Sequence, residues 1–219
     1  MLHSIKVTFL FWVIYSWLLT GCSPDPISLS LCDAIEIGDK EKILEFLGSM
    51  SGAEKSNFCG DGLDPISFAL SLKLFDTADL VIDNTNTEMI SRVDQNEWTP
   101  LTWASINGSS SSVKRLIEKG ASVDSIDTYG YTPLLWASRN GHYEVVKQLV
   151  AAGADINHQS SEGLTSLMLS AMGNKPSVVK YLVALKVDHH LKSKKMGTAL
   201  DIAKSRGFAE IEMILQDIE

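Results

Sequence analysis

A regular spacing of small residues is the feature that most constrains how this chain can fold. Six positions recur with steps of 35, 35, 33, 33 and 33 residues: Ala34, Ala69, Ala104, Ala137, Ser170 and Ala203. A period of about 20–50 residues is typical of arrays in which each unit buries its apolar face only by stacking on its neighbours. The sequence therefore predicts one continuous core, shared by stacked units, and a function that depends on the surface of the stack.

One unit, residues 127–157, illustrates the local structure that we expect. Thr132 can cap a first helix whose first position is Pro133, where a missing N–H costs nothing. Gly141 can end this helix because glycine accepts a positive φ. A second helix follows, in which the apolar side chains of residues 145–150 share one face. Each unit thus consists of a turn, a helix, a tight turn and a second helix.

The start of the first helix contains the same motif in two units, Thr99-Pro-Leu-Thr-Trp-Ala104 and Thr132-Pro-Leu-Leu-Trp-Ala137. This motif resembles the Thr-Pro-Leu-His-x-Ala signature of the ankyrin repeat. The resemblance covers residues 29–219. It implies an all-α solenoid, an ankyrin-repeat domain of about six helix-turn-helix repeats with short hairpin fingers between them.

The other units depart from this pattern. Unit two has Lys73 where a glycine usually ends the first helix, and unit five has Gly173 one place early. In unit three Glu97 occupies the place of Gly130, so we expect that finger to adopt a different turn. The histidine of the motif is replaced throughout, by Thr102, Leu135, Met168 and Asp201. Units one and six, at the two ends of the array, are interpreted as caps.

Residues 1–21 differ in composition from the rest of the chain. Lys6 is their only fixed charge, and an apolar run extends from Val7 to Leu19. This run is too short to span a bilayer comfortably and fits the core of a signal peptide. A short uncleaved anchor and an ordinary secretory signal are the alternatives.

The end of this segment, Leu19-Thr20-Gly21-Cys22, resembles the lipobox of bacterial lipoproteins, in which the cysteine receives lipid. The resemblance implies a lipoprotein signal peptide over residues 1–21, lipidation of Cys22 and a short tether over residues 22–28. By analogy with lipoproteins of Gram-negative bacteria, Ser23 favours the outer membrane, facing the periplasm. Several acyl chains together hold a protein to a membrane where one would not.

Two further cysteines follow, Cys32 in the first unit and Cys59 at the entrance to the second. An export signal implies a compartment in which disulfides form, and these two positions could meet across one repeat interface. A bond there would fasten the first unit to the array. Two unpaired buried thiols are the alternative.

The chain is acidic, with 27 Asp and Glu, 19 Lys and Arg, and a formal net charge of −8. Removal of residues 1–21 takes away Lys6 and changes this charge to −9. Bulk electrostatics therefore exclude nucleic acid and anionic lipid as partners, and they would steer a basic protein toward the array. The alternative is that acidity only keeps a monomer soluble.

The sequence contains no catalytic signature. It lacks a nucleophile elbow, a glycine-rich phosphate loop followed by lysine, and a His-Glu-x-x-His motif. His142 is interpreted as structural, and His189 with His190 as residues of a solvated loop. We therefore expect no enzyme activity, no cofactor and no metal site.

Binding is expected on the concave face that the fingers and the first helices form. The candidate partner-binding residues are Gln95, Asn96, Trp98, Ile106, Asn107, Thr128, Tyr129, Tyr131, Arg139, Asn140, Ser161, Glu162 and Leu164. Trp98, Tyr129 and Tyr131 are the expected anchors, because large aromatic side chains bury much area with little loss of rotamer freedom. The alternative is that these aromatic side chains pack against adjacent fingers.

Two other tryptophans, Trp103 and Trp136, lie within the apolar stripe of their helices. We expect both to be buried in a core ladder, with Phe68, Leu169 and Ile202 at the equivalent positions. Such a position gives them a structural role.

Together these patterns predict a non-enzymatic, protein-binding lipoprotein of the bacterial envelope, monomeric when unbound. A sharper hypothesis is an immunity protein that neutralises a toxin acting in the periplasm, such as a lipase or a wall hydrolase. Membrane tethering, acidity and small size suit an inhibitor that meets an incoming enzyme at its site of action. The alternative is a structural or assembly factor that protects another envelope protein.

Overall fold

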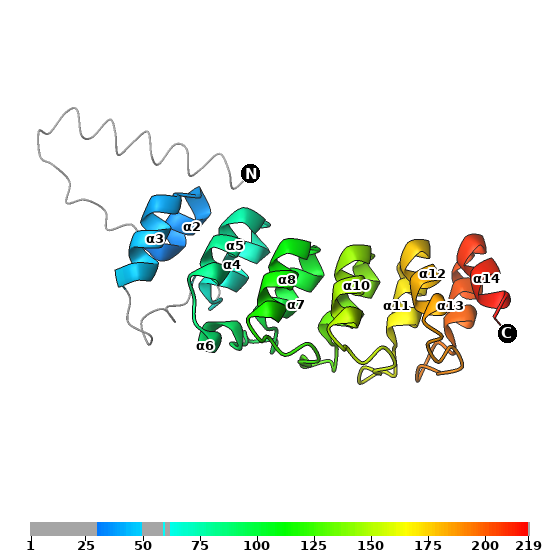
Figure 1. Cartoon of the computed structure of the whole chain (residues 1–219). Coiled ribbons are helices and arrows are strands. Elements are labelled where there is room, and N and C mark those ends of the chain that lie inside the picture. Colours follow the sequence, from blue (N-terminus) through cyan, green and yellow to red (C-terminus); the bar gives the residue numbers. More distant parts are fainter. Residues whose placement is uncertain (1–29, 50–58, 60–61, 219) are drawn as a thin grey trace, which may run out of the picture.

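The computed structural model describes residues 30–49, 59 and 62–218, in which there are 13 helices and no strand. Six antiparallel helix pairs stand side by side along the chain (Figure 1). The pairs are α2 (Leu31–Ile37) with α3 (Lys40–Ser49), α4 (Pro65–Ser71) with α5 (Phe75–Asp83), α7 (Pro100–Asn107) with α8 (Ser110–Glu118), α9 (Pro133–Asn140) with α10 (Tyr143–Ala151), α11 (Ser166–Met172) with α12 (Pro176–Ala184), and α13 (Ala199–Arg206) with α14 (Ala209–Gln216). A single turn, α6 (Thr87–Ile90), follows the second pair. The predicted all-α repeat fold is confirmed.

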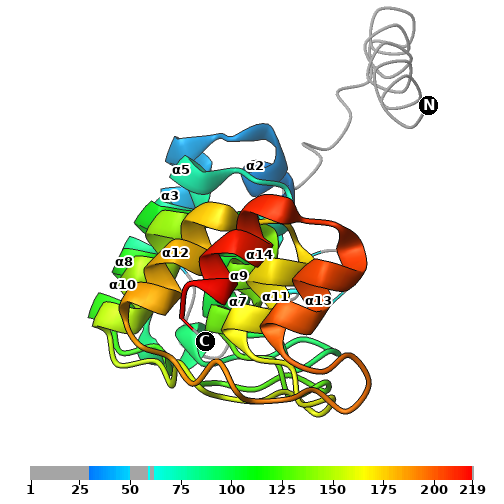
Figure 2. The ribbon, with the colours of Figure 1, turned by 90° about the vertical axis from the view of Figure 1, so that its right-hand side faces the viewer.

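The helices form two layers. The first helix of each pair packs on the first helices of the neighbouring pairs, and the second helices pack on one another in the same way. The fingers, which are the loops that connect one pair to the next from the second pair onward, project toward the same side (Figures 1 and 2). The predicted signal segment, Cys22 and the tether to residue 28 lie outside the described residues. Within the described ranges, every helix is too short or too polar to cross a bilayer.

The first helices begin where a side chain accepts a backbone hydrogen bond. A threonine oxygen accepts from the amide three residues later in four units: Thr99, Thr132, Thr165 and Thr198. In the last unit Asp201 replaces the motif histidine and completes a capping box with Thr198. The hydrogen bonds from the backbone and side chain of Thr198 lower the pKa of Asp201. This departure from the motif therefore gives the last unit a second capping group.

The ends of the first helices explain two further departures. Lys73, with φ 59°, takes the left-handed conformation that glycine supplies elsewhere. In unit five the left-handed residue is Asn174, with φ 52°, whereas Gly173 has an ordinary φ of −83°. Glycine is needed at 173 for a different reason, because a Cβ there would collide with the carbonyl oxygen of Arg139 in the preceding unit.

The small residues that set the period lie where the first helices meet. Ala34, Ala69, Ala104, Ala137, Ser170 and Ala203 are all completely buried. Their small side chains let consecutive first helices approach closely, and buried leucines such as Leu101 and Leu134 fill the space between the two layers. The core is therefore continuous along the stack, as the period predicts.

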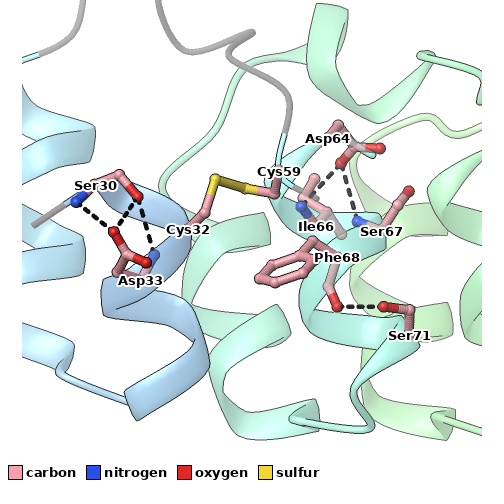
Figure 3. The surroundings of a disulfide bond; sticks show 9 residues. All are labelled: Ser30, Cys32, Asp33, Cys59, Asp64, Ile66, Ser67, Phe68 and Ser71. Atoms are coloured by element: carbon pink, nitrogen blue, oxygen red, sulfur yellow. Dashed lines mark hydrogen bonds between the residues drawn. A yellow bond between two sulfur atoms is a disulfide. The ribbon is translucent and has the colours of Figure 1, made fainter. Parts of the chain in front are cut away.

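A disulfide joins the first pair to the chain segment that leads into the second. The sulfur atoms of Cys32, in α2, and Cys59 lie 2.04 Å apart, and the two Cα atoms 5.4 Å apart (Figure 3). The cross-link closes a loop with a sequence separation of 27 residues. On the chain-entropy account, a loop of this length stabilises the folded state by about 3–4 kcal/mol. The structure thus brings together the two cysteines that the sequence places near one interface.

Candidate functional site

Each of two central fingers is held by an aspartate at its base. In unit four, Oδ1 of Asp127 accepts hydrogen bonds from the amides of Tyr129 and Tyr131, at 2.9 and 2.8 Å. In unit three, Oδ1 of Asp94 accepts from the amides two and four residues later, at 2.8 and 3.0 Å. These paired hydrogen bonds fix the backbone of both turns in the same way.

Glu97 and Gly130 occupy the same place in these two fingers. Their φ angles are 61° and 72°, so both lie in the left-handed region. The prediction that Glu97 would change the turn is therefore wrong. The two amide hydrogen bonds to Asp94 impose the conformation on a residue with a Cβ, at a local cost of about 1–2 kcal/mol.

Asp127 also joins two neighbouring fingers. Its Oδ2 accepts hydrogen bonds from the indole Nε1 of Trp98, in unit three, and of Trp136, in α9, both at 2.9 Å. The residue is 4% exposed, so a nearly buried carboxylate accepts four hydrogen bonds in all. Asp94 accepts one indole, that of Trp103 at 3.1 Å.

Trp98 packs between the other two tryptophans. Its ring lies edge-on to Trp103 and Trp136, with ring centroids 5.0 and 5.4 Å away. The alternative that Trp98 packs against an adjacent finger is therefore the arrangement found. The side chain is half-buried, and its N–H is already satisfied by Asp127.

Trp103 and Trp136 are half-buried on the side of the first helices that faces the fingers. The predicted core ladder is therefore confirmed only in part. Leu169 and Ile202 are buried, Phe68 and Trp103 are half-buried against the core, and Trp136 is half-buried without being part of it. For the two tryptophans the partial exposure has a chemical reason: an indole N–H needs an acceptor, which the aspartates at the finger bases supply. The aliphatic side chains of units five and six have no such need.

A pocket lies between the fingers of units four and five. Its volume is about 340 Å³, and we name it the finger pocket. It is lined by Thr128, Tyr129, Tyr131, Trp136, Arg139, Ser161 and Glu162. The rings of Tyr131 and Trp136 are in contact, with centroids 5.0 Å apart, while Tyr129 is 61% exposed. The pocket therefore combines aromatic walls with hydroxyl and charged groups.

The two charged groups of the finger pocket, Arg139 and Glu162, make different contacts. The guanidinium carbon of Arg139 lies 5.5 Å from the ring centroid of Trp136, a cation–π contact. Glu162 lies 3.4 Å from Nζ of Lys195 in the next finger. Partial burial raises the pKa of Tyr131, an effect that nearby Arg139 opposes, so the phenol keeps its proton at neutral pH.

A family model described as ankyrin repeats (3 copies) matches residues 31–127, 69–160 and 134–218. The chain belongs to the ankyrin-repeat family. No curated protein matches it. Ankyrin repeats are generally non-enzymatic modules of protein–protein interaction, which agrees with a candidate site that is an open pocket on the fingers.

The ankyrin fold brings together six of the residues predicted to bind a partner. Thr128, Tyr129, Tyr131, Arg139, Ser161 and Glu162 all line the finger pocket. Gln95 and Asn96 are exposed one finger away, and Ile106 and Asn107 are half-buried at the end of α7. Asn140 is also half-buried, and its side-chain amide donates to the carbonyl oxygen of Ile106 at 2.8 Å. The side-chain amide that was predicted to contact a partner is thus already engaged within the array.

Leu164 is the predicted contact that the structure contradicts. It is 5% exposed and packs into the core. Tyr131 and Trp98 occupy the equivalent position in their own repeats and stay half-buried, because each has a polar end. A leucine lacks such a group and is stabilised by full burial.

Sequence reasoning missed Trp136 as a lining residue, and it missed the finger aspartates that accept from the indoles: Asp127 from Trp98 and Trp136, and Asp94 from Trp103. The available signal was an aspartate five residues before each Thr-Pro pair, at Asp94 and Asp127. The hydrogen bonds from Trp136 and Trp98, nine and 29 residues away, to Asp127 could not be predicted from that spacing.

The histidines of this ankyrin array have no metal-binding geometry in the described part of the chain, where no group of three potential ligands comes together. The rings of His189 and His190 lie 4.0 Å apart, and the amide of His190 donates to Asp188. His142 lies 2.9 Å, through Nε2, from the carbonyl oxygen of Ile106, which gives it a structural role.

Proposed function

We propose that this ankyrin array binds a protein partner through the finger pocket. The observation that carries the proposal is the pocket itself, in which exposed Tyr129 and Arg139 stand beside half-buried Tyr131. Tyrosine and arginine are enriched among residues that dominate binding energy. No chemistry beyond contact is required of these groups.

The support beneath the pocket favours binding. Four hydrogen bonds to Asp127 fix the finger and the indole of Trp136 before any partner arrives. A surface that is already ordered loses less conformational entropy on association. The pocket therefore resembles a preformed recognition site more than a flexible loop.

A double variant tests this proposal. Tyr129→Ala with Arg139→Ala truncates two exposed side chains and leaves the Asp127 network intact. Recovery of a partner from detergent-solubilised envelope, quantified by mass spectrometry, should fall for this variant. Tyr143→Ala, an exposed tyrosine on the outer helix α10, is the matched control and should recover the same partner as the wild type. Equal recovery by all three proteins would remove the finger pocket from the account.

We further propose that Cys22 anchors the array to a bacterial envelope membrane, with the outer membrane as the expected location. The lipobox-like sequence that ends at Cys22 supports this, and so does the Cys32–Cys59 pair, because disulfides persist mainly in oxidising compartments. Metabolic labelling with a fatty-acid analogue should mark the wild type and not Cys22→Ala. Label that persists in Cys22→Ala contradicts the anchor.

The sharper form of the proposal is an immunity protein that neutralises a periplasmic toxin such as a lipase or wall hydrolase. It is supported by the tether sequence and by a rigid pocket suited to one protein ligand. Deletion of the gene should harm cells only when a neighbouring gene encodes an active hydrolase. A defect that persists without active hydrolase favours instead a factor that assembles or protects another envelope protein.

A further inference from the structure

The charge of the chain is unevenly distributed along the stack. Residues 30–97 contain 14 acidic and five basic residues, whereas residues 98–218 contain 11 acidic and 13 basic residues. The acidity that dominates the whole chain therefore belongs to the first two units and the start of the third. The finger pocket lies beyond them, in units four and five.

Exposed cations lie in the pocket and on the finger that follows it. Arg139 lines it, and Lys194 and Lys195 lie on the last finger, where Lys195 pairs with the lining residue Glu162; all three cations are exposed. A partner at the fingers of units four to six thus meets a part of the chain in which acidic and basic residues nearly balance, although the net charge of the protein is −8. The expectation of a basic partner thus rests on acidity that lies mainly outside these units.

Arg139 is the cation in the pocket that has no carboxylate counterion among the described residues. Of the nearby carboxylates, Asp127 is saturated by four hydrogen bonds, and Glu162 lies against Lys195. The face of Trp136 positions the guanidinium without neutralising it. Guanidinium donors in such a setting match the planar geometry of a carboxylate.

We propose that the finger pocket binds a carboxylate of an acidic partner segment on Arg139, with an adjacent apolar side chain of that segment against Tyr129 and Tyr131. This inference rests on the proposed function and specifies the partner chemistry of the same site. A volume of about 340 Å³ accommodates one acidic side chain and a neighbouring group. A side-chain carboxylate and a chain terminus offer the same chemistry.

Selection from a random peptide library on phage tests the inference, with the full chain in detergent as bait. Peptides that bind the wild type should be enriched in Asp and Glu relative to the input library. Synthetic copies should bind Arg139→Glu about 10- to 100-fold more weakly, the range expected when a charge-assisted hydrogen bond is lost. Lys114→Glu, a charge reversal at an exposed site on the outer helix α8, is the matched control and should bind as the wild type does. Copies with free and amidated C-termini distinguish a terminal from a side-chain carboxylate.

Several results would overturn the inference. These are recovery of no peptide above background, enrichment of basic or uncharged peptides, or binding to Arg139→Glu within twofold of the wild type. Co-sedimentation with phosphatidylglycerol vesicles that Arg139→Glu abolishes, without acidic peptides, assigns the surface to lipid. If recovery of the envelope partner depends on Tyr129 and is unchanged by Arg139→Glu, the proposed function stands and this inference fails.

Discussion

Asp127→Asn should destabilise the array far more than a change of one atom usually does. The carboxylate is 4% exposed, and its two oxygens accept from two amides and two indoles. An asparagine can keep its carbonyl oxygen toward the amides of Tyr129 and Tyr131. Its NH₂ group then faces the N–H groups of Trp98 and Trp136, so two donors lose their acceptor.

The magnitude follows from the type of bond. A hydrogen bond to a charged group contributes about 1.5–3 kcal/mol, so two such losses cost about 3–6 kcal/mol. For a domain of this size, that loss lowers the melting temperature by about 6–24 °C. Urea unfolding followed by tryptophan fluorescence and by circular dichroism measures the free energy, and near-ultraviolet circular dichroism reports the tryptophan cluster.

Two matched variants make this prediction sharp. Asp94→Asn removes the acceptor of one indole and should cost about half as much. Asp155→Asn changes an exposed aspartate whose Oδ1 accepts one amide, and it should cost less than about 1 kcal/mol. An Asp127→Asn protein within 1 kcal/mol of the wild type would refute the reasoning, because the indole hydrogen bonds would then contribute nothing measurable.

Three further predictions concern stability. Cys32→Ser with Cys59→Ser should lower the free energy of unfolding by about 3–4 kcal/mol, and dithiothreitol should destabilise the wild type but leave this variant unchanged. Lys73→Gly should stabilise by about 0.5–1 kcal/mol in urea unfolding: relief of a φ of 59° gains about 1–2 kcal/mol, and the greater chain entropy of glycine cancels about half of it. A destabilised variant contradicts the strain. Burial raises the pKa of Asp64 above 3.8, so the folded state binds more protons and its stability should fall as pH rises from 3.8 through the raised native pKa. Asp64→Asn should remove this pH dependence, and an unchanged slope in paired urea titrations contradicts it.

The fold was predictable because its determinants are local and repeated. A small residue at one position of each unit, Thr-Pro at helix starts and glycine after helix ends each act within a few residues. The reason for Gly173 could not be predicted, because it is not local. Its glycine is required by the carbonyl oxygen of Arg139, 34 residues earlier, and no pattern within the unit shows that contact.

The candidate site was predictable in outline and not in its internal assignments. Tyr129 and Tyr131 were indicated by their finger positions and Arg139 by its place near the end of the first helix, and the structure gathers all three in one pocket. Trp98 and Leu164 occupy the same repeat position as Tyr131. Trp98 nevertheless donates a hydrogen bond to Asp127 in the next finger, and Leu164 is buried. Which outcome occurs depends on the polar end of each side chain and on the acceptor that the neighbouring unit offers.

The central claim, that this protein acts by contact through the finger pocket, is tested most directly by site-specific photo-crosslinking in living cells. Tyr129 is replaced by photoreactive benzoylphenylalanine in one strain, and Tyr143 on the outer layer in another. The account predicts a discrete cross-linked protein adduct from position 129 and none from position 143. Adducts from the outer position alone, or from neither, would contradict it.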